Sequence, residues 1–390
     1  MLNISRVVFI VAGWWLTMAV VCSKPFLPQN DSQILERLPS PTFEQQLRQR
    51  AASRDPANLQ QALELAWAWV RLGREQADPR YYGYAEAVLE PWWATAERWP
   101  EVLLLRATLH QNRHNFQAAL ADLSQVLKRQ PRNAQAWLTR SVILAVLGQP
   151  RAAWADCQPL LRLSSRLLAA TCMGNALSLA GEGTRAYELV HQVWSTRVQS
   201  NTEEQQWALT LLAEIALRQD RPERAEQHFL AALALPQRDI YLLGSYADFL
   251  LQQGRFQEVQ SLLASDSRAD ALLLRLALAE QHLNPVRAAQ LADAFEARLR
   301  ALQRRGENSH LGDSARFLLE LRRQPAEALR LAQANWAQQH DPASAYLVLA
   351  AAIAANEPQA CRPVQRWLQR TGLRDARLQA LLAKLPTVTG

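Results

Sequence analysis

The feature that most constrains this chain is an internal period of about 34 residues, within the range typical of chains that stack one small structural unit many times. From about residue 100 onward the same kinds of residue return at intervals of 33 or 34, with one longer interval of 39. The recurring positions are His114 and Ala119, Gly148 and Ala153, Gly181 and Ala186, Asp220 and Ala225, and Gly254 and Val259. The period predicts a repeat architecture.

Each period is predicted to hold two amphipathic helices joined by a short turn. Apolar residues recur at spacings of three and four, which is the helical pattern. In the clearest unit a bulky Trp137 is followed four residues later by the small Ser141, and a turn at 147–150 leads to Ala152 and Ala153. Small residues allow the two helices to approach closely, whereas bulky ones would overpack the crossing. Ala, Leu, Gln, Arg and Glu dominate and glycine is scarce, so an all-α fold is predicted.

These residues and their spacing resemble the tetratricopeptide repeat family, whose unit of about 34 residues has a W, LG, Y, A, F, A, P pattern. The resemblance covers roughly residues 55 to 385, although the Leu-Gly pair and the Tyr of that pattern are mostly replaced. It implies a right-handed superhelical solenoid of antiparallel helix pairs. The best matches are Trp137, Ser141, Leu144, Gly148, Ala153 and Leu160; Leu103, Ala107, His110, Phe116, Ala119, Leu123 and Pro131; and Leu243, Ala247, Leu250, Gly254, Phe256, Val259 and Leu263.

Weaker helix pairs are predicted on both sides of this region. They are 59–72 with 82–93, 272–281 with 286–305, 311–322 with 326–338, and 344–355 with 359–369. Residues 375–385 are expected to form a terminal helix that caps the last apolar face, as solenoids require. The repeat domain is therefore placed at residues 55–390.

Residues 1–23 have the layout of a secretory signal or a membrane anchor. Arg6 precedes an uncharged apolar run, Val7–Val21, and polar sequence follows from Ser23. The run is shorter than the roughly 20 residues of a membrane span. Cleavage, lipidation at Cys22 and retention as an anchor all remain open. In each case the rest of the chain is expected to be exported, to a bacterial periplasm or to a membrane surface facing it.

Residues 24–54 are predicted to be a tether. Four prolines, Pro25, Pro28, Pro39 and Pro41, lie among polar residues there. Proline at this density disfavours helix and favours extended chain. A helix could start at Thr42.

The sequence carries no motif of a catalytic or cofactor site. G-x-S-x-G, HExxH, GxxxxGK[ST] and GxGxxG do not occur in the sequence. His110 and His114 are four residues apart, but no carboxylate accompanies them at ligand spacing. We therefore predict no enzyme, no metal site and no cofactor.

The cysteine pattern and the distribution of charge argue against a structural zinc site and against a nucleic-acid partner. No cysteine lies in a CxxC pair, which disfavours structural zinc. Cys157 and Cys172 fall on neighbouring predicted helices and could form a disulfide, although two buried free thiols are the favoured interpretation. The net charge is +7, but the arginines are spread along the chain without a basic run, so no nucleic-acid partner is expected.

A protein or peptide partner is the predicted ligand. The resemblance implies that the first helices of successive units line a concave groove. Amides, hydroxyls and carboxylates on that face could bind an extended peptide backbone, or they could form an ordinary solvated surface. The candidate residues are Thr108, Gln111, Gln135, Asn175, Ser178, Glu214 and Asp248. The family's carboxylate clamp is absent, because its positions carry Leu104, Thr108, Thr139, Leu168 and Cys172.

A cluster of tryptophans near the start is the second candidate surface. It comprises Trp67, Trp69, Trp92 and Trp93, and aromatic residues are enriched where proteins bind partners. Residues two apart on a helix diverge by about 200°, so Trp67 and Trp69 cannot both face one core. The alternatives are a tryptophan-rich core, a partner or membrane contact, and a glycan- or cell-wall-binding surface.

Overall fold

The computed structural model describes residues 42–385 except 197–198, 238, 267 and 305–310. The chain divides into two units, Met1–Phe43 and Glu44–Gly390, and the description below concerns the second. The predicted signal or anchor and residues 24–41 of the predicted tether lie outside the described residues. Within the described part, none of the helices combines the length and the apolar character needed to cross a membrane.

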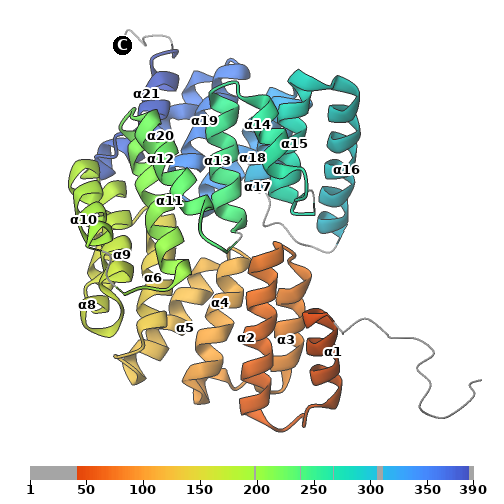
Figure 1. Ribbon diagram of the computed structural model, residues 1–390, viewed down its shortest axis with the longest axis vertical. Helices are drawn as coiled ribbons and strands as arrows, with labels where there is room; N and C mark the ends of the chain where they lie inside the picture. Colours follow the sequence, from red (N-terminus) through yellow and green to blue (C-terminus); the bar gives the residue numbers. More distant parts are fainter. Residues whose placement is uncertain (1–41, 197–198, 238, 267, 305–310, 386–390) are drawn as a thin grey trace, which may run out of the picture. The chain divides into compact units, whose positions relative to one another are not determined.

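The described residues of the second unit form helices and turns, without a strand. The helices follow one another as antiparallel pairs (Figure 1), which confirms the predicted all-α fold. The pairs are α2 Leu59–Gln76 with α3 Arg80–Trp93, α4 Pro100–Asn112 with α5 Phe116–Arg129, α6 Ala134–Val146 with α7 Pro150–Cys157, α9 Arg166–Leu179 with α10 Gly183–Ser195, α11 Thr202–Arg218 with α12 Pro222–Leu233, α13 Ile240–Gln252 with α14 Phe256–Leu263, and α15 Asp270–Leu283 with α16 Pro285–Arg304.

The last units are less regular. The helix α17 Leu311–Arg316 continues into a π-helical turn, η2 Phe317–Leu321, and pairs with α18 Pro325–Gln338. Next, α19 Pro342–Ala354 is followed by η3 Pro358–Cys361 and α20 Arg362–Thr371, and α21 Ala376–Leu382 ends the repeats. Short connecting elements are η1 Ala96–Arg98 and α8 Leu160–Leu163.

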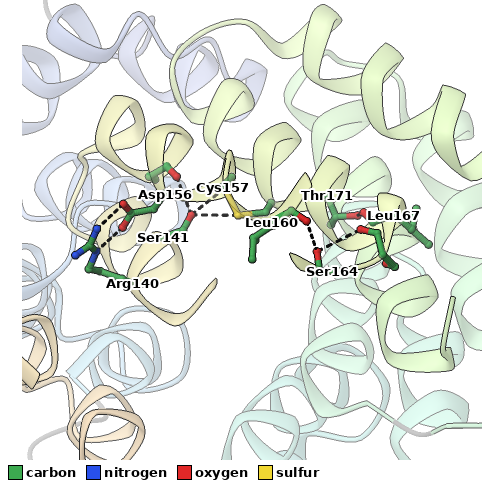
Figure 2. The surroundings of a disulfide bond; sticks show 11 residues. Arg140, Ser141, Asp156, Cys157, Leu160, Ser164, Leu167 and Thr171 are labelled. Carbon is green, nitrogen blue, oxygen red and sulfur yellow. Dashed lines mark hydrogen bonds and ion pairs between the residues drawn. A yellow bond between two sulfur atoms is a disulfide. The ribbon is translucent and has the colours of Figure 1, made fainter. Parts of the chain in front are cut away.

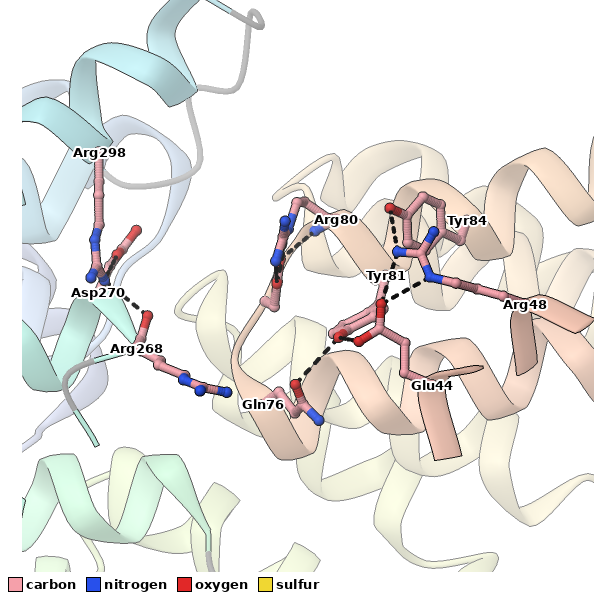
Figure 3. Close-up of polar contacts among 10 residues, drawn as sticks. Glu44, Arg48, Gln76, Arg80, Tyr81, Tyr84, Arg268, Asp270 and Arg298 are labelled. Atoms are coloured by element: carbon pink, nitrogen blue, oxygen red, sulfur yellow. Dashed lines mark hydrogen bonds and ion pairs between the residues drawn. The ribbon is translucent and has the colours of Figure 1, made fainter. Parts of the chain in front are cut away.

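The helical region begins earlier than residue 55. Residues Phe43–Ser53 of the predicted tether form helix α1, and Leu47 on this helix is fully buried. Tyr81 on α3 lies next to it, and the Tyr81 hydroxyl donates to Glu44 of α1 at 2.9 Å (Figure 3). The helix α1 is thus part of the packed structure.

Except between α15 and α16, where Asn284 is extended, the turn inside each pair carries a residue in the left-handed backbone conformation, and these residues mark the sequence period in the structure. A left-handed residue ends a helix by letting the next amide groups bond back to its last carbonyls. In the clearest unit the amide of Gln149 donates to the Leu144 carbonyl, on either side of Gly148. The positions are Ala77, His114, Gly148, Gly181, Asp220, Gly254, Arg323 and Asn356.

Packing inside the pairs also repeats. Arg106 of α4 donates two hydrogen bonds of 2.8 Å to Asp122 of α5, and Arg140 of α6 pairs in the same way with Asp156 of α7. The two ion pairs are separated by one period of the sequence. Gly174 shows why small residues occupy the crossings, since a Cβ there would lie 2.3 Å from Val190.

The superhelix also brings units together that are far apart in sequence. The His340 amide donates a 2.7 Å hydrogen bond to the Val146 carbonyl. Gly148 lies against Trp367 and His340, and Gly181 lies against Gly372. Several complete helix pairs separate the partners in each of these contacts along the chain. The last units therefore pack on the turns of earlier units, an arrangement we call the closure.

Cys157 and Cys172 form a disulfide (Figure 2), so the favoured interpretation of two free thiols is wrong. The short connection through α8 brings α7 and α9 together, and the two Cα atoms are 5.7 Å apart, within the range that a disulfide spans. The hydroxyl oxygen of Ser141 lies 3.0 and 3.3 Å from the two sulfurs and donates to the Ala153 carbonyl. Cys361 is a buried free thiol.

Candidate functional site

A cavity of about 1010 Å³, lined by both charged and apolar residues, lies where the superhelix closes. One side comes from the turns of the first two helix pairs, including Ala77, Tyr82 and Asn112. The other side comes from α13, α15, α17, α19 and α21, including Asp248 and Arg316. The cavity is therefore built from the first helix pairs and from helices of the second half of the chain, and its volume suits a small ligand or a short peptide segment.

An ion network around Asp248 forms part of the cavity wall. The Asp248 carboxylate accepts hydrogen bonds from Arg275 at 2.6 Å and from Arg316 at 2.5 Å. Arg316 also pairs with Glu320 at 3.1 Å. Burial alone would raise the pKa of Asp248, but the two guanidinium groups hold that pKa below its ordinary value. Asp248 is thus a fixed anion between two fixed cations.

A second network links α9, α11 and α13. The Arg218 guanidinium donates to the Ser178 hydroxyl at 2.6 Å and to the Glu214 carboxylate at 3.1 Å. The Tyr241 hydroxyl donates to the same carboxylate at 2.5 Å. The Tyr241 residue is 64% exposed, and the charge of Glu214 together with the hydrogen bond to it raises the pKa of the phenol well above its ordinary value. The phenol therefore stays a neutral hydrogen-bond donor beside an open ring face.

The helix α21 packs against α11 and α19. Arg377 lines the cavity and donates to Asp375 at 3.0 and 2.7 Å. Burial would lower the pKa of Arg377, but the hydrogen bond and charge of Asp375 raise it, with smaller contributions from Glu214 and Asp248. The charges of both networks thus act on one guanidinium group.

Three of the seven predicted groove residues belong to these networks: Ser178, Glu214 and Asp248. Of the seven, Asp248 is the one that lines the cavity. Glu214 and Asp248 lie one period apart and occupy the same position within their units.

The other predicted groove residues lie apart from the cavity wall. Gln111 and Asn175 are half-buried, and Gln135 is exposed with its amide donating to Thr139. Thr108 and Ser178 were expected to face outward, and that expectation is wrong. They are 1% and 3% exposed, because the Thr108 hydroxyl bonds back to the Leu104 carbonyl and the Ser178 hydroxyl bonds to Arg218.

The sequence interpretation missed the arginines of the site. They are Arg218, Arg275, Arg316 and Arg377. Arg218 follows Glu214 by four residues on one helix face, which is a usable signal for an ion pair. The pairing of Asp248 with Arg316 spans 68 residues and crosses unit boundaries, so no local spacing indicates it.

The four candidate tryptophans pack against the hydrophobic core. Trp69 is 2% exposed and stacks on Tyr81 with ring centroids 5.6 Å apart. Trp67, Trp92 and Trp93 are half-buried, so Trp67 and Trp69 face different surroundings, as their spacing predicted. This packing offers no observation that favours glycan binding over a structural role.

The two histidines considered as metal ligands have local roles. His110 lies edge-on to Trp93 with centroids 5.8 Å apart, and burial lowers its pKa. His114 is the left-handed turn residue between α4 and α5. Across the described part of the chain, no three His, Cys, Asp or Glu side chains are grouped as metal ligands would be.

Comparisons with known proteins identify the fold. No protein-family model matches the chain, and no curated protein does. A chain of the crystal structure of the APC/C hetero-tetramer Cut9-Hcn1 is similar, with a TM-score of 0.51 at 12% identity. The match covers 86% of this chain but 65% of that one, which is just under two thirds of its length. At this identity the likeness concerns the fold: the protein has a superhelical fold of the tetratricopeptide repeat type.

The tetratricopeptide repeat domain of P58(IPK) gives a weaker match. Its TM-score is 0.25 at 15% identity, over 84% of this chain and 97% of that one. An overlap of this quality adds nothing to the assignment of the fold.

Proposed function

We propose that this protein is a non-catalytic scaffold that holds a protein or peptide partner on its inner surface, beside the cavity. The fold supports this proposal because stacked helix pairs create an extended concave surface. The fold alone does not specify a function, so the argument depends on the site.

The observation that carries the proposal is the exposed ring of Tyr241 within a fixed set of charges. Tyrosine provides a large contact area with one polar end, and it is enriched among the residues that dominate binding energy. Its neighbour Glu214 is held by Arg218, and the cavity wall nearby holds Asp248 and Arg316 in defined positions. A surface whose side chains are already ordered loses little entropy when a partner binds.

The cell envelope is the proposed location. The apolar run Val7–Val21 predicts export or anchoring, and the disulfide between Cys157 and Cys172 is of the kind that persists in oxidising compartments. Both features support a site of action outside the cytoplasm.

Site-directed photocrosslinking in the native cells tests the proposal. A benzophenone amino acid at position 241 probes the inner surface. The same amino acid at Leu230 of α12 is the matched control, since Leu230 is 51% exposed and lines none of the cavities described. We expect a discrete protein adduct from position 241 that position 230 does not give. No adduct at 241, or the same adducts at both positions, would contradict the proposal.

A further inference from the structure

The helix α20 presents a row of arginines to solvent. Arg362, Arg366 and Arg370 are spaced by four, so they share one helix face, and Arg374 lies three residues beyond the end of the helix. All four side chains are exposed. We call these four residues the arginine stripe.

Within the described part of the chain, the stripe arginines lack a directly paired acidic side chain, although Arg374 lines a recess of about 660 Å³ that also holds Glu182 and Asp220. Among the described residues, none of its four guanidinium groups takes part in an ion pair or a hydrogen bond. No Asp or Glu occurs between Glu357 and Asp375, and Asp375 is buried and engaged by Arg377. Arg330, one unit earlier, shows the contrast, because it pairs with Glu327 on its own helix. The stripe thus concentrates four positive charges in a chain whose net charge is +7.

The opposite face of α20 fixes the stripe in place. Val364 is fully buried and Trp367 is 2% exposed, with its ring edge-on to Trp336 at 5.3 Å. The single aromatic residue of α20 is therefore used in the core. The exposed face offers charge on a rigid platform and no aromatic anchor.

A further arginine extends the positive surface. Arg151, at the start of α7, is exposed and lines a recess of about 600 Å³ together with Arg370. The closure is what brings α7 beside α20. The spacing of the stripe arginines is visible in the sequence, whereas the contribution of Arg151 to the basic surface depends on the folded superhelix.

We propose that the arginine stripe binds the phosphate groups of an anionic phospholipid surface. Guanidinium groups suit phosphate because their donors match its oxygens. A specific protein interface would need apolar or aromatic residues at its centre, and binding of single-stranded nucleic acid relies on exposed aromatic rings. The stripe has neither. A straight row of charges on a firmly packed helix fits a flat array of headgroups, each arginine adding to the attraction.

The proposal does not depend on a partner in the cavity. The test measures binding of the full chain to vesicles of mixed phosphatidylglycerol and phosphatidylcholine and to vesicles of phosphatidylcholine alone. The ratio of the two partition coefficients is the readout, because any contribution of the apolar N-terminal run is shared by both vesicle types.

The test variant is Arg362→Gln/Arg366→Gln/Arg370→Gln. The matched control is Arg74→Gln/Arg132→Gln/Arg221→Gln, which removes the same charge from three exposed arginines on separate units. All six side chains are exposed, and circular dichroism checks that both variants are folded. We expect the stripe variant to lower the ratio by about a hundred-fold at low salt, and the control to leave it nearly unchanged.

Three results would overturn the proposal. The first is an equal decrease of the partition ratio in the stripe variant and in the control. The second is a parent chain that binds both vesicle types equally. The third is a stripe variant that keeps the parent's partition ratio but loses binding to duplex DNA or polyglutamate. The last result would assign the stripe to a polyanionic macromolecule instead.

Discussion

Two turns of this molecule have the same backbone conformation and opposite surroundings. Gly181 and Gly254 both lie in the left-handed region, with φ of +85° and +69°. A Cβ at Gly254 would have nothing within 4 Å, whereas a Cβ at Gly181 would lie 2.2 Å from the carbonyl oxygen of Gly372. The repeat determines the shape of both turns. The closure determines which of them is packed against a distant unit.

The largest change in the free energy of unfolding is expected at Gly181, whose turn is packed against a distant unit. Gly181→Ala must strain the turn and displace the Gly372 backbone, and we expect it to lower the free energy of unfolding by about 4 kcal/mol. Gly254→Ala strains its turn alone and should cost about 1 kcal/mol. Urea unfolding measures both. Equal losses would mean that the Gly181 turn is not packed against the last unit.

The disulfide acts between adjacent units, so removing it tests local packing. Cys157→Ser/Cys172→Ser opens a link across 15 residues, for which the loop-entropy relation gives about 3 kcal/mol. The same thermal or urea unfolding experiment measures the loss. A variant as stable as the parent would show that the bond adds nothing to the α7–α9 contact.

The Asp248 network joins α13, α15 and α17 at the cavity wall. Asp248→Asn leaves Arg275 and Arg316 without their shared anion, and because Asp248 retains some exposure we expect a loss of about 2 kcal/mol. Asp293→Asn is the control, since that carboxylate is 73% exposed and Arg322 keeps Glu296. A loss no larger than the control's would contradict the role of Asp248.

A smaller, pH-dependent effect is expected where α10 contacts α12. The Tyr187 hydroxyl lies 2.7 Å from Nε2 of His228, and burial, with His191 and Arg224 nearby, lowers the His228 pKa to about 4. Because the folded pKa is below the unfolded one, the stabilisation is complete above about pH 6.5 and is lost as the pH falls toward 4. We expect a decline of about 1 kcal/mol over that interval. His228→Gln should flatten it, and an unchanged slope would exclude His228 as its source.

The smallest effect concerns the turn conformation alone. Arg323 holds a left-handed conformation that costs a residue with a side chain, so Arg323→Gly should raise the free energy of unfolding by about 0.5 kcal/mol after the entropy cost of glycine. Asn356→Gly should change it less, because asparagine tolerates this conformation. A clear loss at position 323 would show that the Arg323 side chain stabilises the cavity rim.

The period predicted from the sequence was sufficient for the helix pairs and their turns, because both depend on residues close in the chain. Asp122 and Asp156 even repeat as ion-pair partners. The closure could not be predicted, because its contacts at Gly148 and Gly181 involve glycines that look like ordinary turn residues. The candidate site was predicted in part for the same reason. Glu214 and Asp248 lie one sequence period apart, so the repeat indicates both. The hydrogen bond from Arg316 to Asp248 joins residues 68 apart, and it forms only because the superhelix brings their units together.

Amide hydrogen exchange at His340 tests the closure most directly. Its N–H donates to the carbonyl of Val146, which belongs to a much earlier unit, and no neighbour in its own turn replaces that acceptor. We predict exchange as slow as that of the amides inside α19, and faster exchange in Gly181→Ala. Exchange as fast as that of an exposed turn in the parent protein would mean that the superhelix is open and that the cavity does not form.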